Sequence, residues 1–167
     1  MKIEDNFLDQ KEFDKLQTLM MGEEFSWYYC QSVTSYEGDK DSFQFTHIFY
    51  KTYQPHSPYC SNLDPIIEKL KPKAIIRIKA NLLTKTPEIV ENIFHTDINY
   101  MSKEIMKYGT TSIFYVNTNN GYTKFEDGTK VESVANRMVS FPTNMKHTGT
   151  SCTDEKARIV INFNYFK

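Results

Sequence analysis

The sequence predicts a mainly β fold of the α+β class, in which an antiparallel jelly roll of two sheets carries a few supporting helices in its N-terminal half. Aromatic residues make up 14% of the chain, and with many Ile, Val and Thr residues they favour strands. Helical spacing of apolar residues is confined to the N-terminal half. The remainder consists of short alternating segments separated by turn signals, as expected for a jelly roll.

The length of 167 residues predicts a single domain, with N-terminal helices and strands over about residues 1–73 and the core jelly roll over about residues 74–167. The 20 Lys and Arg residues balance 21 Asp and Glu residues, so the net charge gives no strong signal for a nucleic acid or a membrane as partner. Cys30, Cys60 and Cys152 are too widely spaced for a disulfide framework or a zinc motif. With no apolar segment of membrane-spanning length, we expect a soluble, cytoplasmic protein, in the host cytoplasm if the chain is phage-encoded.

The N-terminal half begins with a predicted amphipathic helix over residues 7–20. Asp9 is expected to cap it, with Glu12 completing a capping box, and Gly22 ends it. Strands are predicted over residues 25–30 and 42–50, with a polar loop over residues 35–41 between them. A second short helix is predicted to run to about Leu70, with Asp64 as its N-cap and Pro65 at its first position.

Two histidines of this half are assigned to structure rather than to chemistry. His47 shares one strand face with Phe43, Phe45 and Phe49, and no carboxylate lies near it in the sequence. We therefore interpret it as a core or pocket-wall residue rather than a metal ligand. His56 lies in a proline-bounded loop and is expected to be exposed.

The C-terminal half contains four predicted strands, over residues 74–82, 111–117, 137–141 and 158–166, with turns at residues 119–121 and 127–128 and a polar connection over residues 148–156. The first strand separates an apolar face from a polar face that carries Arg77, Lys79 and Asn81. The last strand also has an apolar face, and its opposite face carries Arg158, Val160, Asn162 and Asn164. Arg158 can therefore point into a barrel interior, where a buried arginine requires an anionic partner.

The tripeptide His95-Thr96-Asp97 is the first sign of chemistry in this sequence. Residues i and i+2 of a strand point to the same face, so the imidazole and the carboxylate aim at one point. With His147 they form a set of two histidines and one carboxylate. Such a set binds one face of an Fe(II) ion and leaves the remaining coordination positions open.

Four features follow one another in a fixed order: His95-x-Asp97, a Gly-Tyr-Thr-x-Phe turn at residues 121–125, His147 and Arg158. Together with the run over residues 136–142, this order resembles the Fe(II)- and 2-oxoglutarate-dependent dioxygenases. The similarity is greatest to the prolyl-4-hydroxylase-like branch and its small phage and bacterial members. It covers roughly residues 74–167. The turn departs from the family pattern because Tyr122 replaces a second glycine.

This resemblance implies a double-stranded β-helix of the cupin-like type and a hydroxylase that converts 2-oxoglutarate to succinate and CO2. It implies Fe(II) as cofactor, 2-oxoglutarate and O2 as co-substrates, and ascorbate as a supporting reductant. Arg158 is expected to bind the far carboxylate of 2-oxoglutarate through its planar guanidinium. The iron ligands implied are His95, Asp97 and His147, and further co-substrate contacts are assigned to Tyr115, Asn81 and Asn162.

Weaker assignments and other functions stay open. Thr148 and Thr150 flank the distal histidine and could order the co-substrate, whereas Arg77 is either a substrate contact or, more simply, a solvated side chain. A peptidyl residue such as proline is the first candidate substrate and a free amino acid or other small molecule the next; nucleobase repair is less favoured, because no basic groove is evident. The alternatives are a non-catalytic jelly-roll protein, either a cupin-like metal binder or a structural virion protein, and a cupin enzyme that uses no 2-oxoglutarate. The oligomeric state is open.

Overall fold

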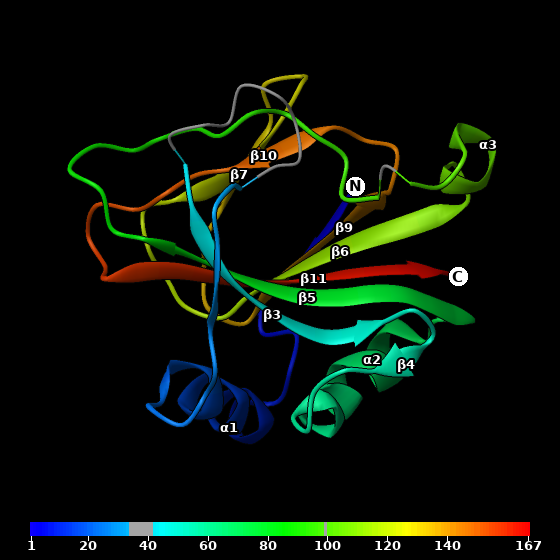
Figure 1. Cartoon of the computed structure of the whole chain (residues 1–167), viewed down its shortest axis with the longest axis horizontal. Helices are drawn as coiled ribbons and strands as arrows, with labels where there is room; N and C mark the ends of the chain where they lie inside the picture. The colour runs from blue at the N-terminus through cyan, green and yellow to red at the C-terminus, as the bar shows by residue number, and fades with distance from the viewer. Residues whose placement is uncertain (34–41, 99) are drawn as a thin grey trace.

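The computed structural model describes residues 1–33, 42–98 and 100–167, and these form two antiparallel sheets (Figure 1). The predicted mainly β, jelly-roll fold is therefore confirmed. The eight-stranded sheet contains, in order, β1 (Lys2–Glu4), β9 (Arg137–Pro142), β6 (Gly109–Tyr115), β11 (Ala157–Phe166), β5 (Ala74–Thr84), β3 (Gln44–Lys51) and β2 (Tyr28–Cys30), and β4 (Gln54–Pro55) pairs with β3. The three-stranded sheet has the order β10 (His147–Gly149), β7 (Tyr122–Phe125) and β8 (Lys130–Glu132).

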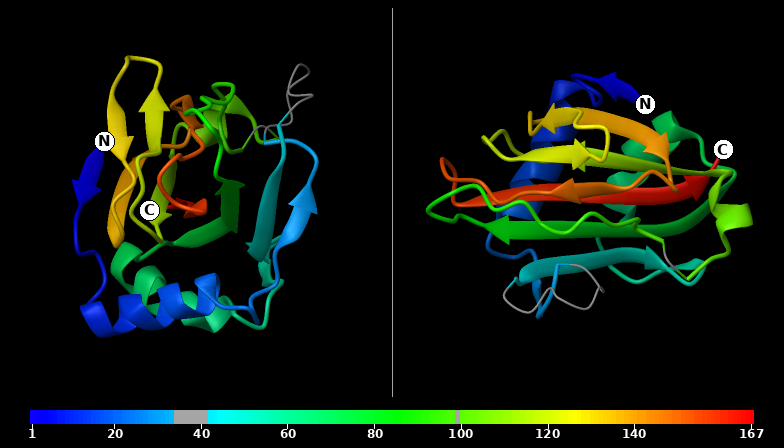
Figure 2. Two further views of the ribbon diagram at one scale, coloured as in Figure 1. Left: turned by 90° about the vertical axis from the view of Figure 1, so that its left-hand side faces the viewer. Right: turned by 90° about the horizontal axis from the view of Figure 1, so that it is seen from above.

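In the described ranges, four helical segments accompany the sheets: α1 (Gln10–Met21), the 3-10 turn η1 (Cys60–Leu63), α2 (Asp64–Leu70) and α3 (Lys103–Met106). The first predicted helix is confirmed with Asp9 as N-cap, although the cap bond is made by the backbone carbonyl of Asp9 and not by its side chain. The second helix has Leu63 as its N-cap instead of Asp64, because the η1 turn leads directly into it. Figure 2 shows α1 and α2 on the same side of the larger sheet.

The alternation along β5 and β11 decides which residues face the helices. Ile78 and Ala80 of β5 and Ile161 and Phe163 of β11 are buried in one apolar cluster with Phe13, Leu16 and Met20 of α1. Burial of this apolar surface is the main source of stability for the layered arrangement. The predicted polar faces of the two strands consequently point away from the helices, into the space between the two sheets.

Several short elements differ from the sequence-based expectations. The expected polar connection over residues 148–156 begins inside a strand, because β10 pairs antiparallel with β7. Two isolated bridges, from Glu91 to Thr150 and from His95 to His147, extend the smaller sheet on the other side of β10. Five short elements have no counterpart among the predicted ones: β1, β4, β7, β8 and α3. The expected loop at residues 35–41 lies outside the described residues.

His47 and His56 lie where the sequence analysis placed them. His47 is buried, its Nδ1 lies 2.7 Å from the carbonyl oxygen of Ser26, and its Nε2 lies 2.7 Å from the hydroxyl of Ser57. His56 is exposed in its loop. Within the part of the chain that the structure describes, no helix combines the length and the apolar character needed to cross a bilayer.

Candidate metal centre

The two candidate histidine ligands come from neighbouring segments of the smaller sheet. His95 lies in the long connection between β5 and α3, and His147 is the first residue of β10. The backbone N–H of His95 donates to the carbonyl of His147 over 2.9 Å, and the reverse bond measures 3.0 Å. This reciprocal pair fixes the two side chains next to each other, with their ring centroids 5.1 Å apart.

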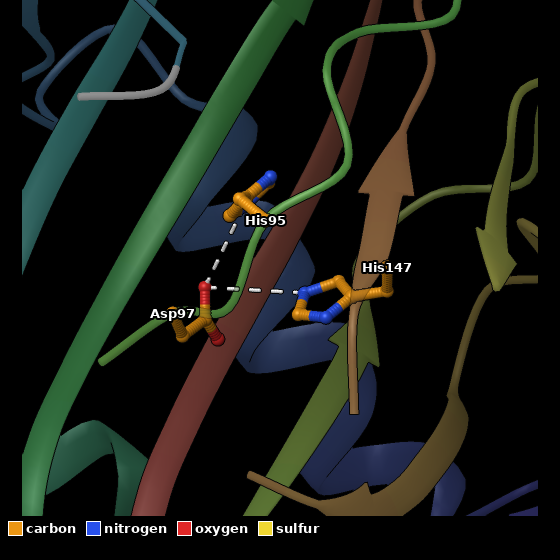
Figure 3. Close-up of side chains that lie close together, drawn as sticks. All are labelled: His95, Asp97 and His147. Atoms are coloured by element: carbon orange, nitrogen blue, oxygen red, sulfur yellow. Dashed lines mark ion pairs between the residues drawn. The ribbon is translucent and has the colours of Figure 1, made fainter. Parts of the chain in front are cut away.

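Asp97 completes the cluster from two residues beyond His95. Nε2 of His95 and Nε2 of His147 each lie 4.0 Å from the same oxygen, Oδ1 of Asp97 (Figure 3). The three ligand atoms all lie within 4.8 Å of one another. An imidazole, a carboxylate and a distal imidazole thus converge on one point, although His95 lies in an isolated bridge and Asp97 lies in a bend, so that the expected strand is not what aligns them.

Hydrogen bonds to the backbone set the tautomers of both rings. Nδ1 of His95 lies 3.0 Å from the carbonyl oxygen of Ile93, and Nδ1 of His147 lies 3.3 Å from that of Met145. A carbonyl only accepts, so each Nδ1 carries the proton and donates it, which leaves the Nε2 lone pair free. Burial lowers the pKa of His147 despite the opposing charge of Asp97, and this favours the neutral, metal-binding form.

The carboxylate of Asp97 is held by side chains from the larger sheet. Asn162 donates through Nδ2 to both oxygens of Asp97, at 3.2 and 3.1 Å, and Asn164 donates to Oδ2 at 3.1 Å. Nη2 of Arg77 lies 3.5 Å from Oδ1. The carboxylate is therefore oriented by three side chains that stand on β5 and β11, and the side chain of Asp97 is only 5% exposed.

The charges around Asp97 keep it ionised. Burial by itself raises the pKa of Asp97, but the neighbouring His147, Arg77 and His95 and the hydrogen bond from Asn164 hold it well below its usual range. A cluster of two neutral imidazoles and one ionised carboxylate without cysteine suits Fe(II) among the transition metals. The residues present therefore fit the iron that the resemblance implies.

The candidate metal centre opens into a pocket between the two sheets. Asn81 of β5 and Asn162 of β11 lie in its wall, and Arg158 lies there too. These three residues and the three metal-ligand candidates are thus brought together by the fold. The rest of the described lining is Val33, Gln44, Lys79, Leu83, Ile113, Thr123, Gly149 and Val160.

Arg158, at the start of β11, is only 3% exposed. Its Nε donates to the hydroxyl of Ser133 over 2.8 Å, and its Nη2 donates to the hydroxyl of Thr123 over 3.0 Å. Among the described residues no carboxylate pairs with the guanidinium, and burial lowers the pKa of Arg158, with Tyr115 opposing the shift. A buried cation without a counter-charge is costly, so this end of the pocket favours an anionic ligand.

Two glycines make room for the guanidinium. A Cβ atom on Gly121 would lie 2.7 Å from Cδ of Arg158, and one on Gly149 would lie 3.2 Å from Nη1. The structure therefore explains the glycine of the Gly-Tyr-Thr-x-Phe turn, because a side chain at Gly121 would collide with Arg158 inside the barrel. Tyr122, which replaces the second glycine, donates its hydroxyl to Glu91 over 2.6 Å at the rim instead.

Three other predicted residues do not line the pocket; they are Tyr115, Thr148 and Thr150. Tyr115 is fully buried beneath the pocket, where its hydroxyl donates to Thr123 over 2.8 Å and its ring centroid lies 5.6 Å from Cζ of Arg158. The hydroxyl of Thr148 donates to the carbonyl of Asn92, and that of Thr150 accepts the backbone N–H of Tyr122 and donates to Ser151. Both threonine hydroxyls therefore form hydrogen bonds with backbone groups.

Arg77 corrects a sequence-based expectation. The simpler interpretation of this charged residue was a solvated side chain, but its side chain is only 14% exposed and pairs with Asp97. Three further residues near the site were given no role from the sequence: Asn164, Lys79 and Thr123. Asn164 and Lys79 lie on strand faces that were predicted to be polar, and this periodicity was the available signal.

No family model matches the chain, and no curated protein matches its sequence. Solved structures do match. A prolyl hydroxylase from Trichoplax adhaerens, in complex with a peptide of the hypoxia inducible factor oxygen degradation domain, is 14% identical with a TM-score of 0.66; the match covers 99% of this chain and 82% of that one. A viral collagen prolyl hydroxylase from Paramecium bursaria Chlorella virus-1, in complex with 2OG, is 14% identical with a TM-score of 0.60, over 99% of this chain and 95% of that one.

A third match has another reaction in its name. The epimerase SnoN from nogalamycin biosynthesis, described as non-heme and alpha ketoglutarate dependent, is 12% identical with a TM-score of 0.68, over 99% of this chain and 75% of that one. At these identities the likeness shows the fold. This chain therefore has the fold shared by prolyl hydroxylases and other 2-oxoglutarate oxygenases.

Proposed function

We propose that the protein is an Fe(II)- and 2-oxoglutarate-dependent dioxygenase that hydroxylates its substrate. One observation carries the proposal: a pocket with the His95, Asp97 and His147 cluster in its wall also contains a buried arginine that no carboxylate of the described residues neutralises. A metal site alone suits many proteins with this fold. The additional unpaired cation calls for an anionic ligand that contacts the metal and Arg158 together.

The register of β11 supports a ligand with two acidic ends. Arg158 precedes Asn162, which contacts Asp97, by four residues, or about 13 Å along a strand at about 3.3 Å per residue. The arginine side chain reaches back over part of this span. A short dicarboxylate such as 2-oxoglutarate can then bind the metal with one end and the guanidinium with the other. Arginine suits the far carboxylate because its fork offers two parallel N–H donors.

The side chains have distinct parts in this function. His95, Asp97 and His147 hold the iron and leave its remaining positions to other ligands. Bound Fe(II) supplies the reaction of O2 with 2-oxoglutarate, which yields succinate and CO2 and transfers one oxygen atom to a C–H bond of the substrate. Tyr115 supports Arg158 through the hydroxyl of Thr123, which accepts from both. We assign Asn81 to the co-substrate because it lies in the pocket wall, whereas Asn162, which also lies there, donates its Nδ2 to Asp97.

The substrate belongs to the proposal as well. A peptidyl residue such as proline is one candidate, supported by the Trichoplax prolyl hydroxylase, which was solved with a peptide. A small molecule is the other, supported by the likeness to the epimerase SnoN from nogalamycin biosynthesis. In either case the substrate must approach the metal through the open side of the pocket.

Anaerobic addition of Fe(II) and 2-oxoglutarate tests the cofactor assignment. We expect a visible charge-transfer band, which is lost in His147→Ala and retained in the control His56→Ala, since His56 is exposed and outside the pocket. Admission of O2 should then release succinate. A folded protein that binds iron but gives neither the band nor succinate would instead be a cupin-like metal binder.

A further inference from the structure

Lys79 lies in the wall of the candidate site, and the proposed function gives it no part. It stands in the middle of β5 on the interior face, between Arg77 and Asn81, and its side chain lines the same pocket as the metal cluster. In the antiparallel register it lies directly opposite Asn162 of β11. Asn162 contacts Asp97, so Lys79 stands at the level of the metal centre and not at the level of Arg158.

The ammonium of Lys79 has no counter-charge within bonding distance among the residues that the structure describes. In the described segments of the chain, neither a hydrogen-bond acceptor nor a carboxylate pairs with its Nζ. Burial, with a smaller contribution from Arg77, lowers the pKa of Lys79 to about 8, although Asp97 and Cys30 oppose the shift. By contrast, the half-buried Lys124 has Glu91 at 2.7 Å. A partly desolvated, unpaired lysine in a pocket is a binding group for an anion.

Among the described residues of the pocket, the ammonium of Lys79 still lacks an anionic partner once the ligands of the proposed function are assigned. Of the described lining residues, Asp97 is the one acid, and Lys79 and Arg158 are the strong bases. The carboxylate of Asp97 already has Arg77 as a partner and is a metal ligand candidate. Arg158 takes the far carboxylate of 2-oxoglutarate in the proposed function, and the near end of that molecule binds the metal. Lys79 then needs an anionic group from a further ligand.

Asn162 provides a second, independent sign of a ligand. Its Nδ2 must face Asp97, because a carboxylate only accepts hydrogen bonds, and this orients Oδ1 away from the carboxylate. Oδ1 is the one buried side-chain polar atom in the described residues that lacks a hydrogen-bond partner. An acceptor of this kind requires a donor, and a ligand N–H or O–H group supplies it.

Resting on the proposed function, we propose that Lys79 is a specificity-determining residue that binds a carboxylate of the substrate, while Asn162 accepts a hydrogen bond from its amino or hydroxyl group. A free amino acid presents both groups at the required short separation. The substrate class is therefore an amino acid or a similar small acid. An aspartate or glutamate side chain in a peptide is the second source of the same carboxylate.

Two sets of probes separate these sources. Succinate formation by the Fe(II)- and 2-oxoglutarate-loaded protein is measured with each of the common amino acids as the free acid, and then with the N-acetyl amide of each, which resembles a residue inside a peptide. Stimulation by free acids but not by their N-acetyl amides identifies a free amino acid as the source of the carboxylate. Stimulation among the amides by the aspartate and glutamate derivatives alone identifies an acidic side chain. Equal stimulation by neutral amides, or none by any probe, overturns the proposal.

Variants of Lys79 test the residue itself. Lys79→Met keeps the length of the side chain without its charge, and it should weaken binding of the active acid by about 10- to 100-fold, measured by calorimetry and as KM. Lys79→Arg should restore part of the affinity. Lys73→Met, at an exposed lysine just before β5, is the matched control. Thermal unfolding of each variant confirms that it is folded.

Two results separate a failure of this inference from a failure of the proposed function. If Lys79→Met binds the acid as tightly as the parent, or instead loses affinity for 2-oxoglutarate, Lys79 does not bind the carboxylate of the substrate. The inference is then wrong. If the parent protein shows neither the charge-transfer band nor succinate, the proposed function itself is wrong. The expected result is that Lys79→Met leaves the 2-oxoglutarate dissociation constant unchanged and binds the active acid more weakly.

Discussion

Arg77 and Asp97 form a largely buried ion pair beside the candidate metal centre, with Nη2 of the arginine 3.5 Å from Oδ1 of the carboxylate. Asn164 closes a ring with them: it accepts from Nε of Arg77 over 3.2 Å and donates to Asp97 over 3.1 Å. Each of the three side chains therefore restrains the other two. The carboxylate is positioned before any metal binds, which lowers the cost of ordering it on binding.

Arg77→Met should weaken iron binding although Arg77 is not a ligand. The substitution removes one of the groups that orient Asp97 and compensate its buried charge, so we expect metal affinity to fall by about 10- to 100-fold. Titration with Fe(II) or Co(II) measures this change. Arg137→Met is the matched control, because Arg137 pairs with Asp5 at the other edge of the larger sheet. Equal affinity in both variants would contradict the positioning role.

Gly149→Ala should separate co-substrate binding from metal binding. The added Cβ would lie 3.2 Å from Nη1 of Arg158, a tight contact that displaces the guanidinium from its present place. We expect the dissociation constant of 2-oxoglutarate to rise by about tenfold or more while Fe(II) affinity stays unchanged. Calorimetric titrations with each ligand give the two constants. Loss of metal binding in this variant would mean that the alanine disturbs β10 and its histidine instead.

The parts of the fold with strong periodicity were predictable from the sequence. The alternation in β11 assigned Ile161 and Phe163 to the apolar side and Arg158 and Asn162 to the interior, and the structure has them there. The same logic failed for β10, because a strand of three residues shows no alternation and depends on its pairing with β7. Such pairings join distant segments and leave no local signal.

The residues of the candidate site were also only partly predictable from the sequence. His95, Asp97, His147 and Arg158 were identified by residue type and order. The contacts around them were not, because they depend on cross-strand register, which places Asn164 opposite Arg77. A charged row on a strand is usually solvated, and the strands of the smaller sheet that face this row, β7 and β10, were not predicted from the sequence. For this reason Arg77 was interpreted more simply as a solvated side chain, and its ion pair with Asp97 was not predicted.

Arg158→Met should abolish 2-oxoglutarate binding and leave the metal site intact. The variant keeps an unbranched side chain in the interior but removes the group that binds the far carboxylate, so the charge-transfer band should disappear at ordinary 2-oxoglutarate concentrations. Arg158→Lys should recover only part of the affinity, because an ammonium lacks the two-pronged geometry. Fe(II) titration of the same samples is the control. A band of undiminished strength in Arg158→Met would exclude this residue as the co-substrate anchor.

The pair of Asp5 and Arg137 predicts a pH dependence of stability that is independent of the metal centre. It links the segment after β1 to β9, with Nε of Arg137 donating to Asp5 over 2.6 Å. This hydrogen bond lowers the pKa of Asp5, so the folded chain binds that proton less readily than the unfolded chain. The stabilisation is therefore complete above the ordinary carboxyl pKa of about 3.9 and is lost as the pH falls below it.

Urea unfolding of the parent and of Asp5→Asn at a series of pH values measures this contribution. The parent should be slightly the more stable at pH 7, by a small amount because the Asp5 side chain is 55% exposed, and the difference should shrink as the pH falls below about 4. Asp127→Asn gives a comparison, because Asp127 is also exposed but accepts a hydrogen bond from the backbone of Thr129 instead of an arginine. Added salt should weaken the Asp5 effect more than the Asp127 effect, since screening acts on the ion pair. A difference that grows as the pH falls would contradict the assignment.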